Sequence, residues 1–169
     1  DMEDRQSLMD ALRPFVFRRY IDYGAIDSLR DMKSMIEGEV RRRNLQDDVK
    51  LGPGGIREVE FIAQCFQLIR GGRSPALQQR ELLEVLDACG EEGCLPLAAV
   101  AELQQAYLFL RNVEHAIQGY DDKQSQQLPA SPEAQQGLLV ALEFADWDEF
   151  VAELERHRSA VSRHFAALI

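Results

Sequence analysis

The chain has 169 residues, of which 46% are hydrophobic and 28% are charged. This composition supplies enough apolar side chains for a folded core, so extended disorder is excluded, and the length suits one domain or a compact domain with a helical lead-in. No apolar run approaches the roughly 20 residues that a membrane-spanning helix needs, and no basic segment precedes an apolar leader, so we expect no membrane association.

The charge is unevenly distributed along the chain. Residues 1–75 carry 13 basic and 13 acidic side chains, whereas residues 76–169 carry 6 and 16, so the second half accounts for the whole net charge of −10. The only dense basic cluster is Arg41-Arg42-Arg43. Nucleic-acid binders show a basic surface, so we expect no nucleic-acid partner. The acidic half is expected to be a solvated surface or a docking face for a basic partner.

The predicted elements are helices throughout. Proline and glycine are few, long stretches are rich in helix-forming residues, and no run alternates β-branched with polar residues as a strand would. Residues 4–23 predict one helix ending before Pro14 and another starting there, because proline suits only a first turn. The next helix is predicted over 25–43. Its apolar residues recur at steps of three and four: Ile26, Leu29, Met32, Ile36 and Val40.

A break rich in glycine follows, and further helices are predicted over 55–70, 77–89, 96–120, 132–144 and from 147 onward. Ser131 before Pro132 indicates an N-cap, and Asp146 with Glu149 indicates a capping box. Short links between amphipathic helices favour an all-α, antiparallel bundle of about six to eight helices without a sheet. We divide it into lead-in helices at 1–49 and a helical bundle at 50–169. Because the chain begins with Asp1 rather than Met, we expect it to be part of a longer protein.

The segment Lys50-Leu51-Gly52-Pro53-Gly54-Gly55-Ile56-Arg57-Glu58 carries the chemistry that composition does not explain. A glycine-rich loop that opens a helix can present free backbone N–H groups and the positive end of the helix dipole to an anion. The alternative is a sharp turn between helices, for which glycine is equally suited. The candidate nucleotide- or phosphate-binding residues are Lys50, Gly52, Gly54, Gly55, Arg57 and Glu58.

Other reactive side chains do not form a site in the sequence. Glu58 and Glu60 point to different sides of a helix, so we expect Glu58 to pair with a neighbour and Glu60 to face solvent. Three cysteines without zinc-site spacing indicate small buried side chains in a reducing cytoplasm, and the three histidines lack partners at metal-ligand spacing. No P-loop, catalytic triad or Gly-Ser followed by Asp-x-Asp is present. We therefore expect no metal ligand and no catalytic residue in this chain, and an accessory role.

Six blocks, in order, resemble the bacterial glutamine-synthetase adenylyltransferase/adenylyl-removing enzyme family, and the resemblance covers essentially the whole chain. They are Pro14–Tyr23, Ile26–Lys33, Lys50–Ile62, Phe66–Arg73, Tyr107–Arg111 and Phe144–Trp147. The block that begins at Lys50 is also similar to the more distant PII uridylyltransferase. The Gly-Gly-Ile-Arg-Glu form, with Arg-Gly-Gly-Arg downstream, resembles the N-terminal, adenylyl-removing half of the family enzyme.

The resemblance implies a parent enzyme with two nucleotidyltransferase halves. One half removes AMP from a tyrosine of glutamine synthetase by phosphorolysis to ADP, and the other attaches AMP from ATP, in the control of nitrogen metabolism. It implies Mg²⁺, ATP, ADP and phosphate for the parent enzyme, with the metal-binding carboxylates upstream of this chain. It also implies three partners: glutamine synthetase, the PII signal protein and the nucleotidyltransferase domain of the same polypeptide.

Two interpretations of this chain remain open at the level of sequence. In the first, the block at Lys50–Glu60 closes over the nucleotide or phosphate and completes an active site whose metal ligands lie elsewhere. In the second, the chain is a structural bundle that relays signals from the PII protein, and its acidic second half presents a surface to a neighbour.

Overall fold

The computed structural model describes residues 7–8, 11–14, 16–17, 23–121 and 126–168. Its helices are α2 (Tyr23–Arg43), α3 (Ile56–Arg70), the 3-10 helix η1 (Pro75–Leu77), α4 (Leu82–Glu91), α5 (Leu97–Asp121), α6 (Pro132–Leu142) and α7 (Trp147–Ala167). Within these ranges no strand forms, and Asp48 and Gln127 make one isolated antiparallel bridge. The prediction of an all-α bundle is confirmed.

The helices predicted over 4–23 fall largely outside the described residues. Those that are described there, at 7–8, 11–14 and 16, are helical. None of the helices in the described part of the chain is both long enough and apolar enough to cross a membrane.

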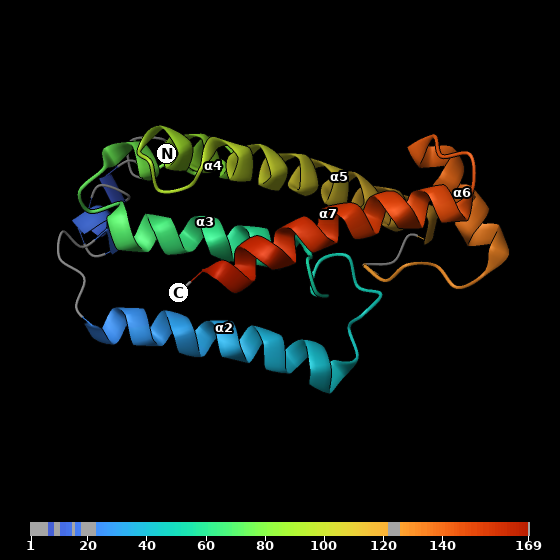
Figure 1. Cartoon of the computed structure of the whole chain (residues 1–169), viewed down its shortest axis with the longest axis horizontal. Coiled ribbons are helices and arrows are strands. Elements are labelled where there is room, and N and C mark those ends of the chain that lie inside the picture. Colours follow the sequence, from blue (N-terminus) through green and yellow to red (C-terminus); the bar gives the residue numbers. More distant parts are fainter. Residues whose placement is uncertain (1–6, 9–10, 15, 18–22, 122–125, 169) are drawn as a thin grey trace.

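Two long antiparallel helices, α5 and α7, form the axis of the molecule (Figure 1). Helices α3 and α4 pack along one half of this pair, and α6 packs along the other half. Helix α2 runs along the lower edge of the view, antiparallel to α3. The loop between α2 and α3 therefore reaches the middle of the molecule, where the two halves meet.

The core follows this division into two clusters. One lies between α3, α4, the first half of α5 and the end of α7, and it includes Phe61 and Phe165, whose rings meet edge to face at 5.6 Å. The other lies between the second half of α5, α6 and the start of α7, around the fully buried Phe150. Tyr107 on α5 packs against both clusters. The apolar residues at helical spacing on α3, α5 and α7 thus contribute to the core, as their period predicts, whereas Met32 of the predicted stripe on α2 is exposed.

Helix α2 is attached mainly through a few specific contacts. Leu29 is buried in the first core cluster, while Met32 and Met35 on the same helix are exposed. Lys33 Nζ donates hydrogen bonds to the backbone carbonyls of Ala166 (3.1 Å) and Leu168 (2.7 Å) at the end of α7. These bonds satisfy carbonyls that a helix terminus leaves without partners.

The helix predicted over 77–89 begins five residues later than expected. Residues Pro75–Leu77 form a 3-10 turn, and α4 starts only at Leu82. The side chain of Gln67 donates to the carbonyls of Leu77 and Gln79, both at 2.9 Å, so these carbonyls do not begin a helical ladder. Side-chain bonds to the backbone compete with helix formation in this way.

Both predicted N-caps are present. Ser131 Oγ accepts a hydrogen bond from Ala134 N, and Asp146 Oδ1 accepts one from Glu149 N at 2.8 Å. The capping box differs in one detail, because the Glu149 carboxylate accepts from the N–H of Ala145, one residue before the cap. The cap nevertheless fixes the start of α7, the helix that carries the residues facing the glycine-rich loop.

Candidate functional site

The glycine-rich loop is organised by Asp48, which is buried although it is charged. Its Oδ1 accepts hydrogen bonds from the N–H groups of Lys50 (2.9 Å) and Leu51 (2.7 Å), and its carbonyl accepts from Gly52 N at 2.9 Å. Neighbouring backbone bonds, Val49 N to Gln126 O and Leu128 N to Asp47 O, tie the loop to the segment before α6. An Asp side chain that bonds to backbone N–H groups two and three residues on is a strong turn former.

The start of α3 does not offer the free N–H groups that the sequence led us to expect. The N–H groups of residues 50–52 donate to Asp48, and those of residues 55–58 donate to backbone carbonyls of Gly52, Val49, Lys50 and Gly55. The remaining N–H, that of Gly54, interacts with the carboxylate of Glu58. The backbone contribution to an anion site is therefore already used within the chain, and the phosphate assignment stays a prediction that depends on side chains.

The glycines have a different role, which is close approach to α7. A Cβ on Gly52 would lie 2.5 Å from the guanidinium Nη2 of Arg158, and one on Gly54 would overlap the backbone carbonyl of the same residue. Gly54 also has a φ of +65°, a conformation that side-chain-bearing residues rarely adopt. Gly55 is confined by the carbonyls of Lys50 and Gly52. The loop needs glycine because backbone and α7 meet there.

Arg158 fills the loop with a buried cation. Its Nε donates to Pro53 O at 2.9 Å, and its Nη2 donates to Gln46 O at 2.7 Å and to Asp48 O at 3.2 Å. Only 7% of the residue is exposed, and its carboxylate partner Glu155 is 3.7 Å away and open to solvent. Burial lowers the pKa of Arg158, and nearby carboxylates oppose that shift. No sequence pattern near the loop indicates Arg158 as its partner, because the residue lies more than 100 positions away.

The two cationic side chains predicted at the site are placed at its surface. Lys50 Nζ lies 3.5 Å from Oε1 of Glu114, and Arg57 Nη1 lies 2.7 Å from Oε2 of Glu39; both cations are about one third exposed. The Arg57 hydrogen bond is the main cause that lowers the pKa of Glu39. Each cation thus has a carboxylate partner and retains a solvent-facing side.

Glu114 on α5 collects several of these groups around one buried carboxylate. The residue is 2% exposed, and its carboxylate accepts hydrogen bonds from Arg111 Nη1 at 2.5 Å and from Gln126 Nε2 at 3.2 Å. The same carboxylate forms an ion pair with Lys50. A carboxylate that is desolvated to this degree is stable only when it is paired and hydrogen-bonded. Lys50 is therefore positioned by α5 as well as by its own loop.

Glu58 is buried in the first turn of α3, and its Oε2 has no hydrogen-bond partner. Burial is the main cause that raises its pKa to about 7; the Gly54 N–H opposes this rise, and Glu37 on α2 adds to it. Among the described contacts Glu58 does not form the expected ion pair with a neighbour. The charge of Arg158 and the Ser162 hydroxyl also oppose the rise in its pKa. Glu60 is half-buried rather than fully in solvent.

The remaining candidates take structural roles. Among the described residues no three His, Cys, Asp or Glu side chains gather as metal ligands. His157 stacks on Phe109 with centroids 4.6 Å apart, and His164 bonds to Glu102 at 2.6 Å. Cys65 and Cys89 are buried in the core, where burial raises the pKa of each thiol to about 12.

The fold and the loop therefore define a helical domain whose surface cations are fixed at a glycine-rich helix start. A model of the protein family described as GlnD PII-uridylyltransferase matches residues 30–169, and the chain belongs to this family.

Three curated relatives are bifunctional glutamine synthetase adenylyltransferase/adenylyl-removing enzymes, which confirms the resemblance predicted from the sequence blocks. The enzyme of Hahella chejuensis is 51% identical over 169 residues, covering all of this chain and 18% of the relative. Those of Acinetobacter baylyi and Nitrosococcus oceani are 55% and 52% identical, covering 96% and 99% of this chain and 18% and 17% of the relative. The chain thus spans less than a fifth of the length of the relatives that it matches.

Proposed function

We propose that this chain is a helical accessory domain in the adenylyl-removing half of a cytoplasmic glutamine-synthetase adenylyltransferase/adenylyl-removing enzyme. The proposed reaction is phosphorolysis of the AMP–tyrosine bond of glutamine synthetase, which yields ADP, while the other half of the enzyme adenylylates from ATP. The observation that carries the proposal is the placement of Lys50 and Arg57 beside one rigid loop, each with one solvent-facing side. The identity to three such enzymes over nearly the whole chain supports it.

In this proposal, the chain contributes charge neutralisation rather than bond chemistry. An incoming phosphate competes with Glu39 for Arg57 and with Glu114 for Lys50, and the two cations then balance the charge on the phosphate and on the departing ADP. Because the resemblance implies metal-binding carboxylates upstream of this chain, we assign the metal to the nucleotidyltransferase domain of the same polypeptide and derive no step from it.

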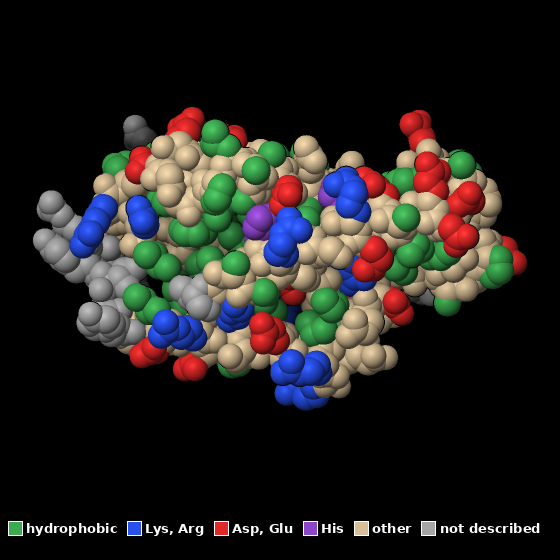
Figure 2. Space-filling view, in the orientation of Figure 1, with side chains coloured by type: hydrophobic (Ala, Val, Ile, Leu, Met, Phe, Trp, Pro, Cys, Tyr) green, Lys and Arg blue, Asp and Glu red, His purple; other side chains and the backbone are tan. Residues whose placement is uncertain are grey.

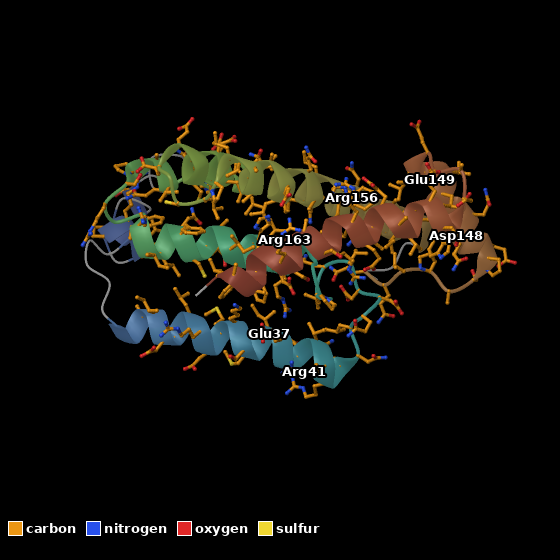
Figure 3. All side chains as sticks on the ribbon, viewed as in Figure 1. Glu37, Arg41, Asp148, Glu149, Arg156 and Arg163 are labelled. Atoms are coloured by element: carbon orange, nitrogen blue, oxygen red, sulfur yellow. The ribbon has the colours of Figure 1, made fainter. Side chains whose placement is uncertain are left out.

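The test uses the full-length enzyme with Arg57→Ala, Lys50→Ala and a matched control, Arg41→Ala, on the exposed face of α2 (Figure 3). We expect ADP release from adenylylated glutamine synthetase to fall on the order of 10²-fold for the first two variants, by analogy with the loss of one charge-stabilising donor. Circular dichroism establishes that each variant is folded. An unchanged rate in both would make the loop a structural turn and remove the main support for this function.

A second candidate function is regulatory, and the acidic end of the molecule favours it. Residues 131–155 contain seven Asp and Glu and no Lys or Arg. Figure 2 shows acidic side chains gathered over the end formed by α6 and the start of α7. A groove of about 600 Å³ beside them is lined by Phe109, Leu142 and Phe144 together with Glu149 and Glu153.

In this alternative the chain relays signals from the PII protein and has no direct part in the active site. Binding of PII or of glutamine synthetase to the isolated chain, measured by calorimetry and lost in Glu149→Lys, would support it. Absence of binding to either protein, together with loss of activity in the Lys50 and Arg57 variants, would count against it.

A further inference from the structure

We infer that Arg158 is the positioning residue of the glycine-rich loop: its guanidinium, held by three loop carbonyls, sets where Lys50 and Arg57 stand. This inference rests on the proposed function for its catalytic consequence, but its structural part stands on the contacts alone. Arg158 lies on α7, more than 100 residues from the loop, so the contact joins two distant parts of the chain.

The first step is that the guanidinium defines the path of the loop. Three donor contacts reach the carbonyls of Gln46, Asp48 and Pro53, which are spread over eight residues of the loop. Arginine presents its donors in a rigid planar fork, so three acceptors are fixed relative to one another as well as to α7. A lysine would supply one compact charge without this geometry.

The second step is that the loop transmits this placement to the two cations. Asp48, whose carbonyl binds Arg158, also holds the N–H groups of Lys50 and Leu51 through its carboxylate. The carbonyl of Lys50 in turn accepts from Arg57 N at 3.0 Å. Two hydrogen bonds therefore connect the guanidinium of Arg158 to Lys50 through Asp48, and a third continues from Lys50 to Arg57.

The glycines of the loop leave the space that the buried Arg158 occupies. The contact requires that no side chain stands between loop and helix, and both Gly52 and Gly54 meet Arg158 where a Cβ would be. The cation is buried, so the carbonyls replace the water that it loses. Removing Arg158 would deprive three carbonyl oxygens of a hydrogen-bond donor. The buried partner explains the glycines better than an external anion does, because the loop N–H groups are already used.

The structural arm of the test uses amide hydrogen exchange on this chain, with Arg158→Lys and Arg158→Met. Arg163→Met is the matched control, since Arg163 lies on the same helix but pairs with Glu102 (Figure 3). We expect exchange at residues 50–57 to accelerate at least about tenfold while α5 stays protected, because only the loop loses its anchor. Equal acceleration everywhere, or none in the loop, would overturn the inference; Arg158→Lys serves if Arg158→Met does not fold.

The catalytic arm uses the full-length enzyme and separates positioning from general stability. We expect Arg158→Ala to raise the KM for phosphate on the order of 10-fold or more, since small misplacements of binding groups are costly, while the KM for adenylylated glutamine synthetase stays the same. Guanidinium ion at millimolar concentration should partly restore Arg158→Ala but not Arg57→Ala.

The outcomes of the two proposals differ. If Lys50→Ala and Arg57→Ala leave phosphorolysis unchanged, the proposed function fails, whereas the exchange result still decides the structural role of Arg158. If those variants lose activity but Arg158→Ala keeps a normal KM for phosphate, the positioning role is overturned and the proposed function stands.

Discussion

At the scale of the residue, burial decides what the charged groups around the loop can do. Arg158 and Glu58 lie within the same region, one as a cation satisfied by carbonyls and the other as a carboxyl with one oxygen unpartnered. Water is excluded from both, so the charged form of each is disfavoured unless the protein replaces the lost hydration. For Arg158 the loop does so; for Glu58 the replacement is incomplete.

Glu58 makes the free energy of unfolding of the chain depend on pH. Burial raises its pKa from 4.5 to about 7, so between these values the folded state binds a proton that the unfolded state has lost. The contribution of protonated Glu58 to the free energy of unfolding is therefore fully present below pH 4.5 and is lost as pH rises through 7. Glu58→Gln removes this dependence, and we expect the variant to be more stable than the native chain at pH 8 by on the order of 3 kcal/mol, and similar to it at pH 4.

Urea unfolding at pH 4, 6 and 8 measures this difference. Glu60→Gln, on the same helix, reports what the loss of a neighbouring carboxylate does in general. A Glu58→Gln variant that is less stable than the native chain at every pH would show that the ionised carboxylate, with Gly54, Ser162 and Arg158, is the favoured form.

At the scale of the element, the loop and the start of α3 form one unit with the face of α7. The loop uses its hydrogen bonds internally, and its contact with α7 depends on glycine at positions where backbones meet. Such a unit resists substitution for two separable reasons, which are the backbone conformation at positive φ and the space available to a Cβ.

Gly54 and Gly93 separate these two reasons. Both have positive φ, +65° and +68°, but nothing lies within 4 Å of a Cβ at Gly93, whereas one at Gly54 overlaps the backbone of Arg158. We expect Gly93→Ala to lose roughly 1 kcal/mol of unfolding free energy from conformation alone. Gly54→Ala should lose about 1–3 kcal/mol more, because rigid backbone must move. Thermal unfolding of the two variants measures the conformational and the steric loss. Equal losses would show that the backbone of α7 moves away from the added Cβ at little cost.

At the scale of the whole molecule, α2 is attached differently from the other helices. It buries only Leu29 and Val40, packs Ile36 against the first core cluster, and adds polar links from Lys33 to the end of α7 and from Glu39 to Arg57. An element with few buried apolar contacts opens more readily than the core of a domain. Because Glu39 pairs with Arg57, movement of α2 would also change the surroundings of one candidate phosphate ligand.

Lys33→Met tests this attachment. The variant removes the bonds to the carbonyls of Ala166 and Leu168 while keeping an apolar stem, and we expect exchange of α2 amides to rise about tenfold while α5 is unaffected. Arg30→Met is the matched control, since Arg30 pairs only with Asp27 on its own helix among the contacts described. A similar rise in α5 would mean that α2 and the bundle unfold together.

Much of the fold is readable from local pattern. The helix over residues 25–43, the helix that starts after Gly55 and the two N-caps at Ser131 and Asp146 are all found, because they depend on neighbours three or four residues apart. The start of α4 is not predicted correctly. The side chain of Gln67, on α3, donates hydrogen bonds to the carbonyls of Leu77 and Gln79, which would otherwise have begun the helix.

The sequence by itself determined the helical class, the break at Lys50–Gly55 and the two cations that flank it, since these depend on residue type and short spacing. Only the tertiary structure decided what the glycines are for. Their partner is Arg158, brought to the loop by the antiparallel return of α7 along α5, and the same packing buries Glu58 and places Glu114 against Lys50. Burial and proximity between distant segments arise from packing, and no local pattern contains them.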